Sequence, residues 1–185
     1  MKKIFGVILC LASCWFGGEI VATAGDIPTN AAPVRIGVYD SRAVAFAWFW
    51  SDPQQGRLRE LTRAARAAKA AGETNRFQDL GAGLRRLQDE LHREVFSTAP
   101  AEGALADLKE QLPEIARQAS VSALVSQWDK PALAKYPDAE KVDVTGRLVQ
   151  QFKPAEKQLK VIADLQKQKP LPLDECNELI RKGEI

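Results

Sequence analysis

Residues 58–95 read LRELTRAARAAKAAGETNRFQDLGAGLRRLQDELHREV, and this stretch carries two apolar seams with helical spacing. The first seam runs from Leu58 to Ala68 and the second from Phe77 to Val95, with apolar residues recurring at intervals of three and four. A continuation of the first seam would need apolar residues at positions 72 and 75, where glycine and asparagine stand. Because the phase breaks over residues 72–75, the pattern predicts two helices joined by a tight turn.

The two predicted helices differ in the size of their seam residues and in their charge. Asp52, as N-cap, and Pro53, at the first helical position, predict where the first helix begins. The first seam ends in alanines whereas the second is mostly leucine, so small residues can face large ones and the helices can lie close together. The first helix also has a basic face, which either steers the protein toward anionic lipid headgroups or an acidic client, or simply keeps the helix soluble. Only Glu60 interrupts this face, which consists of Arg57, Arg59, Arg63, Arg66 and Lys69.

An alternating segment and a short apolar segment precede the hairpin. Residues 34–40 alternate apolar and other side chains, which predicts a strand. Asp40 or Ser41 then caps a short helix over residues 42–50. That helix is apolar all round, so we expect other elements to cover it on several sides.

Three large aromatic residues end this short helix, and two of them are among the four tryptophans of the chain. They are either core residues or a surface that contacts something apolar. Three such side chains in a row cannot all stay in water at reasonable cost, which favours the core. Two of them exposed together would instead form an interaction site. Trp48, Phe49 and Trp50 are therefore the candidate client-contact residues.

The remaining chain completes an α+β fold: a small three-stranded sheet with a helical, coiled-coil-like hairpin and additional C-terminal helices. A third helix is expected over residues 101–119, with a kink at Pro113. The second and third strands are expected over residues 120–128 and 141–144, with a single helical turn at 131–135 between them. Further helices are predicted to begin at Thr145, at Pro154 and at about Asp174, the last one stopping at Gly183.

The first residues, MKKIFGVILCLASCWFGG, have a lysine pair followed by an apolar run that is too short to span a bilayer. This pattern predicts a secretory signal and hence a periplasmic protein. Cleavage after Ala24 is one outcome, and a lipobox ending at Cys14, which would make the protein a lipoprotein, is the other. The predicted organisation is a signal peptide over residues 1–24, a linker over 25–33, a sheet core with helical arms over 34–152, and a C-terminal helical extension over 153–185.

The sequence contains few residues suited to catalysis or metal binding. His92 is the only histidine, and no second ligand is at hand to converge with it on a metal, so we expect a solvated helical residue. Cys176 remains after cleavage and is expected to be a half-buried helix residue. Asp40, Asp129 and Asp143 sit at strand ends, where carboxylates either catalyse or, more often, cap the next helix. With a net charge of +2, the chain is not expected to bind nucleic acid. We expect no catalytic, cofactor-binding or metal-binding residues.

Two segments resemble the Skp/OmpH family of periplasmic outer-membrane-protein chaperones. VRIGVYDSRAV, residues 34–44, is similar to the opening strand and short apolar helix of that family, and VSALVSQWDKPALAKYPDAEKVDVTGRLVQQF, residues 121–152, is similar to its closing unit. The resemblance implies a small sheet core with protruding helical arms, usually trimeric, that encloses unfolded outer-membrane proteins without ATP. The chain departs from the family in its shorter hairpin, its extra helix over residues 101–119 and its added tail.

The leading hypothesis is an exported, non-enzymatic envelope protein that binds unfolded or apolar protein segments, and a homo-oligomer is the assembly that the resemblance implies. The alternative is a lipid-anchored scaffold module, held in the membrane through Cys14, that binds a folded partner. An enzyme would require Asp40, Asp129 and Asp143 to converge on one polar pocket.

Overall fold

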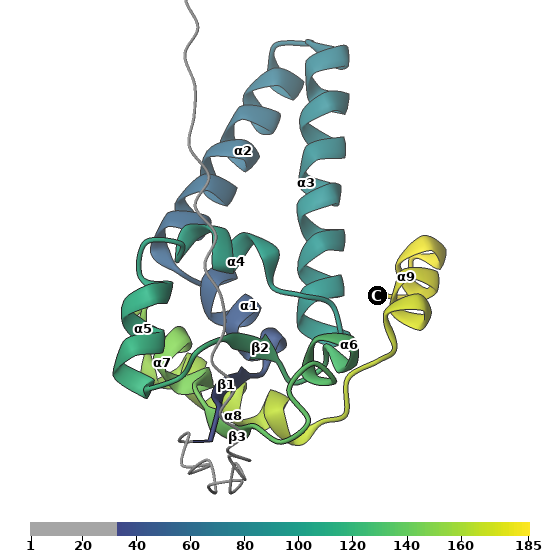
Figure 1. Cartoon of the computed structure of the whole chain (residues 1–185). Coiled ribbons are helices and arrows are strands. Elements are labelled where there is room, and N and C mark those ends of the chain that lie inside the picture. Colours follow the sequence, from purple (N-terminus) through teal and green to yellow (C-terminus); the bar gives the residue numbers. More distant parts are fainter. Residues whose placement is uncertain (1–32) are drawn as a thin grey trace, which may run out of the picture. The chain divides into compact units, whose positions relative to one another are not determined.

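The computed structural model describes residues 33–185, which form one compact unit from Pro33 to Ile185 (Figure 1). The predicted signal peptide, Cys14 and all but the last residue of the predicted linker lie outside the described residues. None of the described helices is long and apolar enough to cross a membrane.

A three-stranded sheet with the order β2-β1-β3 confirms the predicted α+β class. Its strands are β1 (Arg35–Tyr39), β2 (Leu124–Ser126) and β3 (Glu140–Asp143). Both outer strands run parallel to β1, which is the central strand. Parallel neighbours need crossover connections, and here the helical hairpin lies within the first of them. The second strand is shorter than predicted, because only three residues of the 120–128 segment pair with β1.

Gly37 stands at the middle of β1, where other side chains leave no room for a larger residue. A β-carbon at this position would lie 2.7 Å from Leu124 Cδ2 and 3.1 Å from both methyl carbons of Val144. The glycine therefore lets Leu124 and Val144 close over the central strand, which explains its place in an otherwise ordinary strand sequence.

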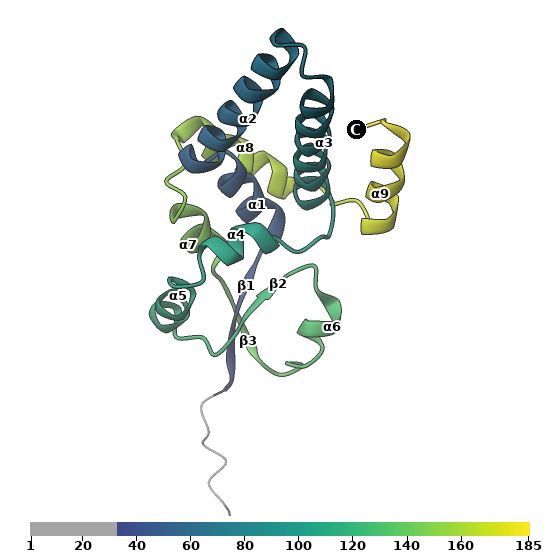
Figure 2. The ribbon, with the colours of Figure 1, turned by 90° about the horizontal axis from the view of Figure 1, so that it is seen from above.

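The helix α1 (Ser41–Phe49) follows β1 and lies at the centre of the unit (Figure 2). Asp40 is its N-cap, and the Asp40 carboxylate accepts a hydrogen bond from the backbone N–H of Arg42. As predicted for a helix that is apolar all round, other helices cover it on several sides: it packs against α3, α4, α7 and α8.

The helices α2 (Asp52–Ala70) and α3 (Thr74–Phe96) confirm the predicted hairpin and run antiparallel (Figure 1). Gly72 adopts φ +71° in the turn between them, a conformation that glycine reaches without a steric penalty. Ala65 and Ala68 are the buried seam residues of α2, as expected if small residues face large ones. The N-cap is Ser51 rather than Asp52, so the helix begins one residue earlier than predicted.

The predicted third helix over residues 101–119 is two helices, α4 (Glu102–Asp107) and α5 (Leu112–Ala119). The break precedes Pro113, so the prediction of one kinked helix was wrong. Proline lacks the N–H that a helix interior requires, and here it stands in the first turn of α5, where that N–H has no helical partner anyway.

The C-terminal helices belong to the same compact unit as the sheet core. They are α6 (Lys130–Leu133), α7 (Thr145–Gln150), α8 (Glu156–Lys167) and α9 (Leu173–Lys182). The helix α8 packs on α1 and α9 packs on α3. Leu171 attaches the connecting segment to the end of α3, because its N–H donates to the Phe96 carbonyl at 2.9 Å and its carbonyl accepts from the Thr98 N–H at 3.1 Å. The tail predicted over residues 153–185 thus packs directly on the arms and core.

Candidate functional site

Trp48 lies where the end of α1 meets α4. Its indole Nε1–H donates to Asp107 Oδ2 at 2.6 Å, and Gln54 donates to the same oxygen at 3.4 Å. The ring packs so closely on Gly103 that a β-carbon there would stand 2.6 Å from Trp48 Cη2. Trp48 is therefore a half-buried joint between helices, with its polar atom satisfied.

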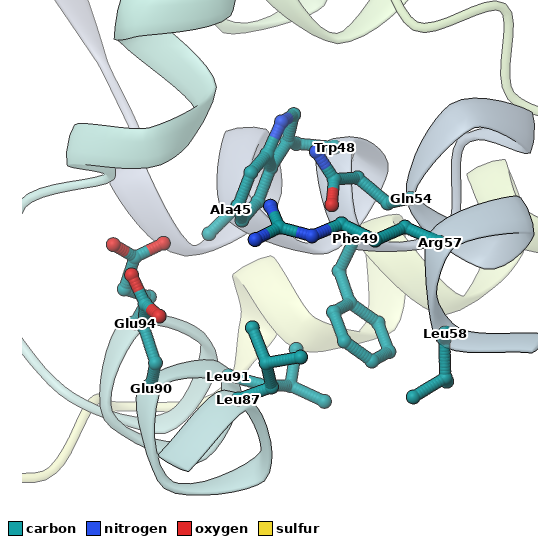
Figure 3. A pocket seen from close by; sticks show the side chains of 10 residues that line it. All are labelled: Ala45, Trp48, Phe49, Gln54, Arg57, Leu58, Leu87, Glu90, Leu91 and Glu94. Carbon is teal, nitrogen blue, oxygen red and sulfur yellow. The ribbon is translucent and has the colours of Figure 1, made fainter. Parts of the chain in front are cut away.

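Phe49 occupies the base of the hairpin, between α2 and α3. Figure 3 shows its ring pointing into a pocket whose walls include Leu58, Leu87 and Leu91. The aromatic ring fills the space where the two hairpin helices separate to accommodate α1. Phe49 is half-buried and holds the arms on the core.

Trp50 is the exposed member of the aromatic triplet, with 43 % of its surface accessible. It packs against Phe46 at a ring-centroid distance of 6.0 Å and against the edge of Phe49 at 5.8 Å. The structure therefore separates the three candidate client-contact residues: Trp48 and Phe49 join helices, and Trp50 faces solvent.

An apolar groove opens beside Trp50, between α3 and α8, with α1 as its floor; we refer to it as the α3–α8 groove. Phe96 and Val161 border it, and each leaves 42 % of its surface accessible. The groove has a volume of about 360 Å³, within the range of ligand-binding cavities. Its other lining residues are Phe46, Leu91, His92, Val95, Asp164, Leu165 and Gln168.

Neither Phe96 nor Val161 was singled out by the sequence pattern. Phe96 follows the last seam residue, Val95, which is buried, whereas Phe96 reaches solvent. Val161 stands beside Ile162 in α8, and only Ile162 faces the core. In α3 and in α8 alike, an apolar residue stands beside the buried apolar stripe of the helix rather than within it. That position could have identified Phe96 and Val161 from the sequence.

Glu94 is a nearly buried carboxylate of α3 at the base of the hairpin. Only 6 % of its surface is accessible, and it lines the same pocket as Phe49 and Arg57 (Figure 3). Burial, followed by repulsion from Glu90 and Glu102, raises the pKa of Glu94 to about 7, although the Glu102 backbone N–H and Arg93 favour the charged form. The carboxylate therefore changes protonation state near neutral pH.

The three strand-end aspartates do not converge. Each accepts a hydrogen bond from a backbone N–H at the start of the helix that follows it. The donors are Arg42 for Asp40, Ala132 for Asp129 and Thr145 for Asp143, at 3.0, 2.9 and 2.8 Å. This is the geometry of helix and turn caps, and it gives no shared pocket for acid–base chemistry.

A buried ion pair fills the crevice at the carboxyl end of the central strand. In parallel sheets with this strand order, ligands bind between β1 and β3, at the carboxyl ends of the strands. Here the Arg42 guanidinium pairs with the Asp40 carboxylate at 3.0 Å, and both side chains are 1 % exposed. Trp128 donates to Asp40 Oδ1 at 3.0 Å and lies under the guanidinium, and Arg42 also donates to the Gln168 carbonyl. The chain's own side chains thus occupy this place.

His92 and Cys176 are more buried than the sequence suggested. His92 is half-buried in the α3–α8 groove, 5.6 Å from the Phe96 ring, so the prediction of a solvated residue was wrong. Its Nδ1 is buried and has no hydrogen-bond partner within residues 33–185. Cys176 is fully buried rather than half-buried, and its thiol donates to the His92 carbonyl at 3.7 Å. Burial raises the pKa of this thiol. Among the described residues no group of three or more histidine, cysteine, aspartate or glutamate side chains is placed to hold a metal ion.

No protein-family model, curated protein or solved structure matches this chain.

Proposed function

We propose that this chain is an exported, non-enzymatic holdase of the cell envelope that binds apolar segments of unfolded proteins, outer-membrane proteins among them, in the α3–α8 groove. The observation that carries the proposal is the grouping of Trp50, Phe96 and Val161 around one groove. Single exposed apolar side chains are ordinary on a protein surface, whereas a contiguous group around a hollow is typical of an interaction site.

The size of the groove implies weak and reversible binding. Full burial of a large apolar side chain stabilises a complex by about 1.5–3 kcal/mol, and these three side chains are already more than half buried. Covering them contributes roughly 1 kcal/mol each, and the client side chains add a similar amount, offset by the entropy lost on association. The resulting dissociation constant is roughly millimolar or weaker for one segment. A client held this weakly is released without ATP, and a homo-oligomer would raise the overall affinity by presenting several grooves.

The hairpin provides a second apolar surface. Leu80, Leu84 and Leu87 of α3 recur at helical spacing and are only half-buried. An extended client segment that leaves the α3–α8 groove near Leu91 can continue along this stripe. The hairpin helices are about 28 and 34 Å long, so such contacts extend well beyond the groove.

An aggregation assay tests the proposal. The purified protein is mixed at stoichiometric ratio with an unfolded outer-membrane protein diluted from denaturant, and light scattering is followed. We expect the wild type to delay aggregation and the double variant Phe96→Ser/Val161→Ser to lose most of the delay. Val34→Ser is the matched control, because Val34 is 55 % exposed but lies outside the groove. A wild-type protein that gives no delay removes the holdase proposal.

The basic face of α2 favours a second candidate, a lipid-anchored envelope module. Its five cations are exposed and form no ion pair within the described residues. A row of unpaired cations on one helix is suited to an anionic membrane surface. Mass spectrometry of the protein from its native host separates the two candidates. A diacylglyceryl group on Cys14 supports the anchored module, whereas an N-terminus at Gly25 contradicts it.

A further inference from the structure

Trp50 also borders a second groove, which lies between the start of α2, the end of α4 and the turn from α7 to α8; we refer to it as the α4–α7 groove. Its volume of about 700 Å³ is in the upper part of the range for ligand-binding sites. The holdase proposal does not use this groove.

Both aromatic and polar side chains line the α4–α7 groove. Trp50 and Phe152 present apolar ring surface to it, and Trp48 lies in its wall with its indole N–H engaged by Asp107. More than half of the lining residues carry side chains that form hydrogen bonds. The α3–α8 groove differs in this respect, since its lining is mostly apolar.

Three glutamine side chains line the α4–α7 groove. Gln111 and Gln151 are exposed on it, and the Gln151 amide nitrogen donates to the Arg147 carbonyl at 3.2 Å. The Gln158 amide is used within the chain, since its oxygen accepts from the Ala155 N–H at 2.6 Å and its nitrogen donates to the Trp50 carbonyl at 3.3 Å. The Gln111 amide offers two donor hydrogens and one acceptor oxygen, so it can bond to a hydroxyl group in either sense, and Gln151 offers its acceptor oxygen. Such a lining does not require a charged ligand.

The charges of the α4–α7 groove disfavour an anionic ligand. Asp52 and Asp107 contribute two negative charges and Lys153 contributes one positive charge, which leaves a formal net charge of −1. A phosphate or nucleic acid would be repelled by this balance. A sugar ring is neutral, carries apolar C–H faces that stack on aromatic rings, and has hydroxyl groups around its rim that bond to amides and carboxylates. Its chemistry therefore matches both kinds of side chain in the groove.

Lys153 adopts a backbone conformation that is unfavourable for its residue type. Its φ is +51°, in the left-handed region, and it also precedes Pro154, which disfavours helical backbone conformations in the residue before it. Glycine would adopt this conformation more easily. Residues kept in such conformations cluster at ligand-binding sites, and among residues 33–185 the strained residue is the one cation that lines the α4–α7 groove.

We propose that the α4–α7 groove binds a neutral saccharide chain, with Trp50 and Phe152 stacking on sugar rings and with Asp107, Gln111, Gln151 and Lys153 bonding to the hydroxyl groups. A protein of the cell envelope meets such chains in the glycans around it. The two grooves share Trp50 among their lining residues, and the other lining residues differ, so variants outside Trp50 test the two activities independently.

Calorimetric titration with three oligosaccharides tests the proposal: chitotetraose, cellotetraose and maltotetraose, each up to about 10 mM, since carbohydrate sites of this size bind weakly. We expect at least one to bind and to change the tryptophan fluorescence, because Trp48 and Trp50 line the groove. Phe152→Ala and Gln111→Ala should each weaken binding about tenfold, the loss expected for one stacking or hydrogen-bonding contact. Phe96→Ser, in the other groove, should leave saccharide affinity unchanged.

Lys153→Gly separates loss of a ligand contact from loss of folding. Glycine adopts the left-handed backbone conformation of Lys153 without strain, so the variant should leave the midpoint of thermal unfolding unchanged or raise it. Its saccharide affinity should fall severalfold. The proposal is overturned if none of the three oligosaccharides binds, or if binding is indifferent to Phe152→Ala and Gln111→Ala. Binding of a lysine-rich peptide without binding of any saccharide also overturns it, in favour of a cation site.

Discussion

The carboxyl edge of the sheet and the surroundings of Trp50 use their side chains in opposite ways. At the sheet edge, Asp40 and Arg42 are charged, yet both are buried and bonded to each other and to Trp128. Around Trp50, apolar groups remain in water although the core is close by. Interactions that are complete within the chain stabilise the fold, whereas groups left without internal partners are available to a ligand. Substitutions in the two regions should therefore affect different measurements.

The largest expected effect is at the buried ion pair. Arg42→Met removes the partner of the Asp40 carboxylate and leaves a buried charge without a cation, so we expect a loss of about 3–5 kcal/mol in the free energy of unfolding. Urea denaturation followed by circular dichroism measures it. Arg35→Met is the control, because the Arg35–Glu140 pair at 3.0 Å is largely exposed and should contribute at most about 1 kcal/mol. Equal losses in the two variants would contradict the distinction between buried and exposed pairs.

A smaller effect is expected where Trp48 packs on α4. Gly103→Ala places a β-carbon 2.6 Å from the ring and forces Trp48 or α4 to move, which should cost about 1–3 kcal/mol in the free energy of unfolding.

Gly81→Ala is the matched helical control, since a β-carbon at Gly81 meets nothing within 4 Å. This variant should gain up to about 1 kcal/mol, the difference in helix propensity between the two residues. Chemical denaturation of both variants gives the comparison. A Gly103→Ala protein as stable as the wild type would show that Trp48 is not held tightly at this joint.

Glu94 should make stability depend on pH. Its folded-state pKa of about 7 exceeds the ordinary value of 4.5, so the folded protein favours the protonated form. Its stabilising contribution is complete below about pH 4.5 and is lost as the pH rises through 7. Glu94→Gln should therefore be more stable than the wild type by about 2 kcal/mol at pH 8 and similar to it at pH 4.5.

The same pH series on Glu114→Gln checks the direction in which a shifted carboxyl pKa changes the free energy of unfolding with pH. Hydrogen bonds from Arg117 and then Gln118 lower the pKa of Glu114 to about 2, so its contribution is present above about pH 4.5 and is lost as the pH falls. The two variants should therefore change the pH dependence of unfolding in opposite directions. Thermal unfolding at pH 3, 4.5, 6 and 8 measures both, because the Glu114 effect falls below pH 4.5 and the Glu94 effect above it. Parallel curves for Glu94→Gln and wild type would exclude an ionisable Glu94 near neutrality.

The smallest effect on stability is expected in the α3–α8 groove. Phe96→Ser removes a side chain that is 42 % exposed and follows the last buried residue of α3, so the free energy of unfolding should change by about 0.5 kcal/mol or less. Client holding should nevertheless fall, as in the aggregation assay. A loss of several kcal/mol would show that Phe96 is a core residue, and the groove would then lose one of its walls.

Local patterns predicted the elements better than they predicted what those elements contact. Three features could be predicted from the sequence, because each depends on residues close together in the chain: the helix break at Gly72, the strand around Gly37 and the helix end at Gly183. The split of residues 101–119 was missed because Pro113 was taken as an interior kink rather than as the start of a helix. The aromatic triplet was read as one unit, although its members face three different neighbours.

By itself, the sequence determined the α+β class, the helical hairpin and the central apolar helix, since periodicity and backbone preference act over a few residues. Only the tertiary structure decided that all three strands run parallel, that Arg42 fills the crevice at their carboxyl ends, and that Phe96 and Val161 meet beside Trp50. These features join residues up to 126 positions apart, as in the bond from Arg42 to Gln168. Whether an apolar side chain stays exposed depends on which distant segments cover it, and no local pattern contains that information.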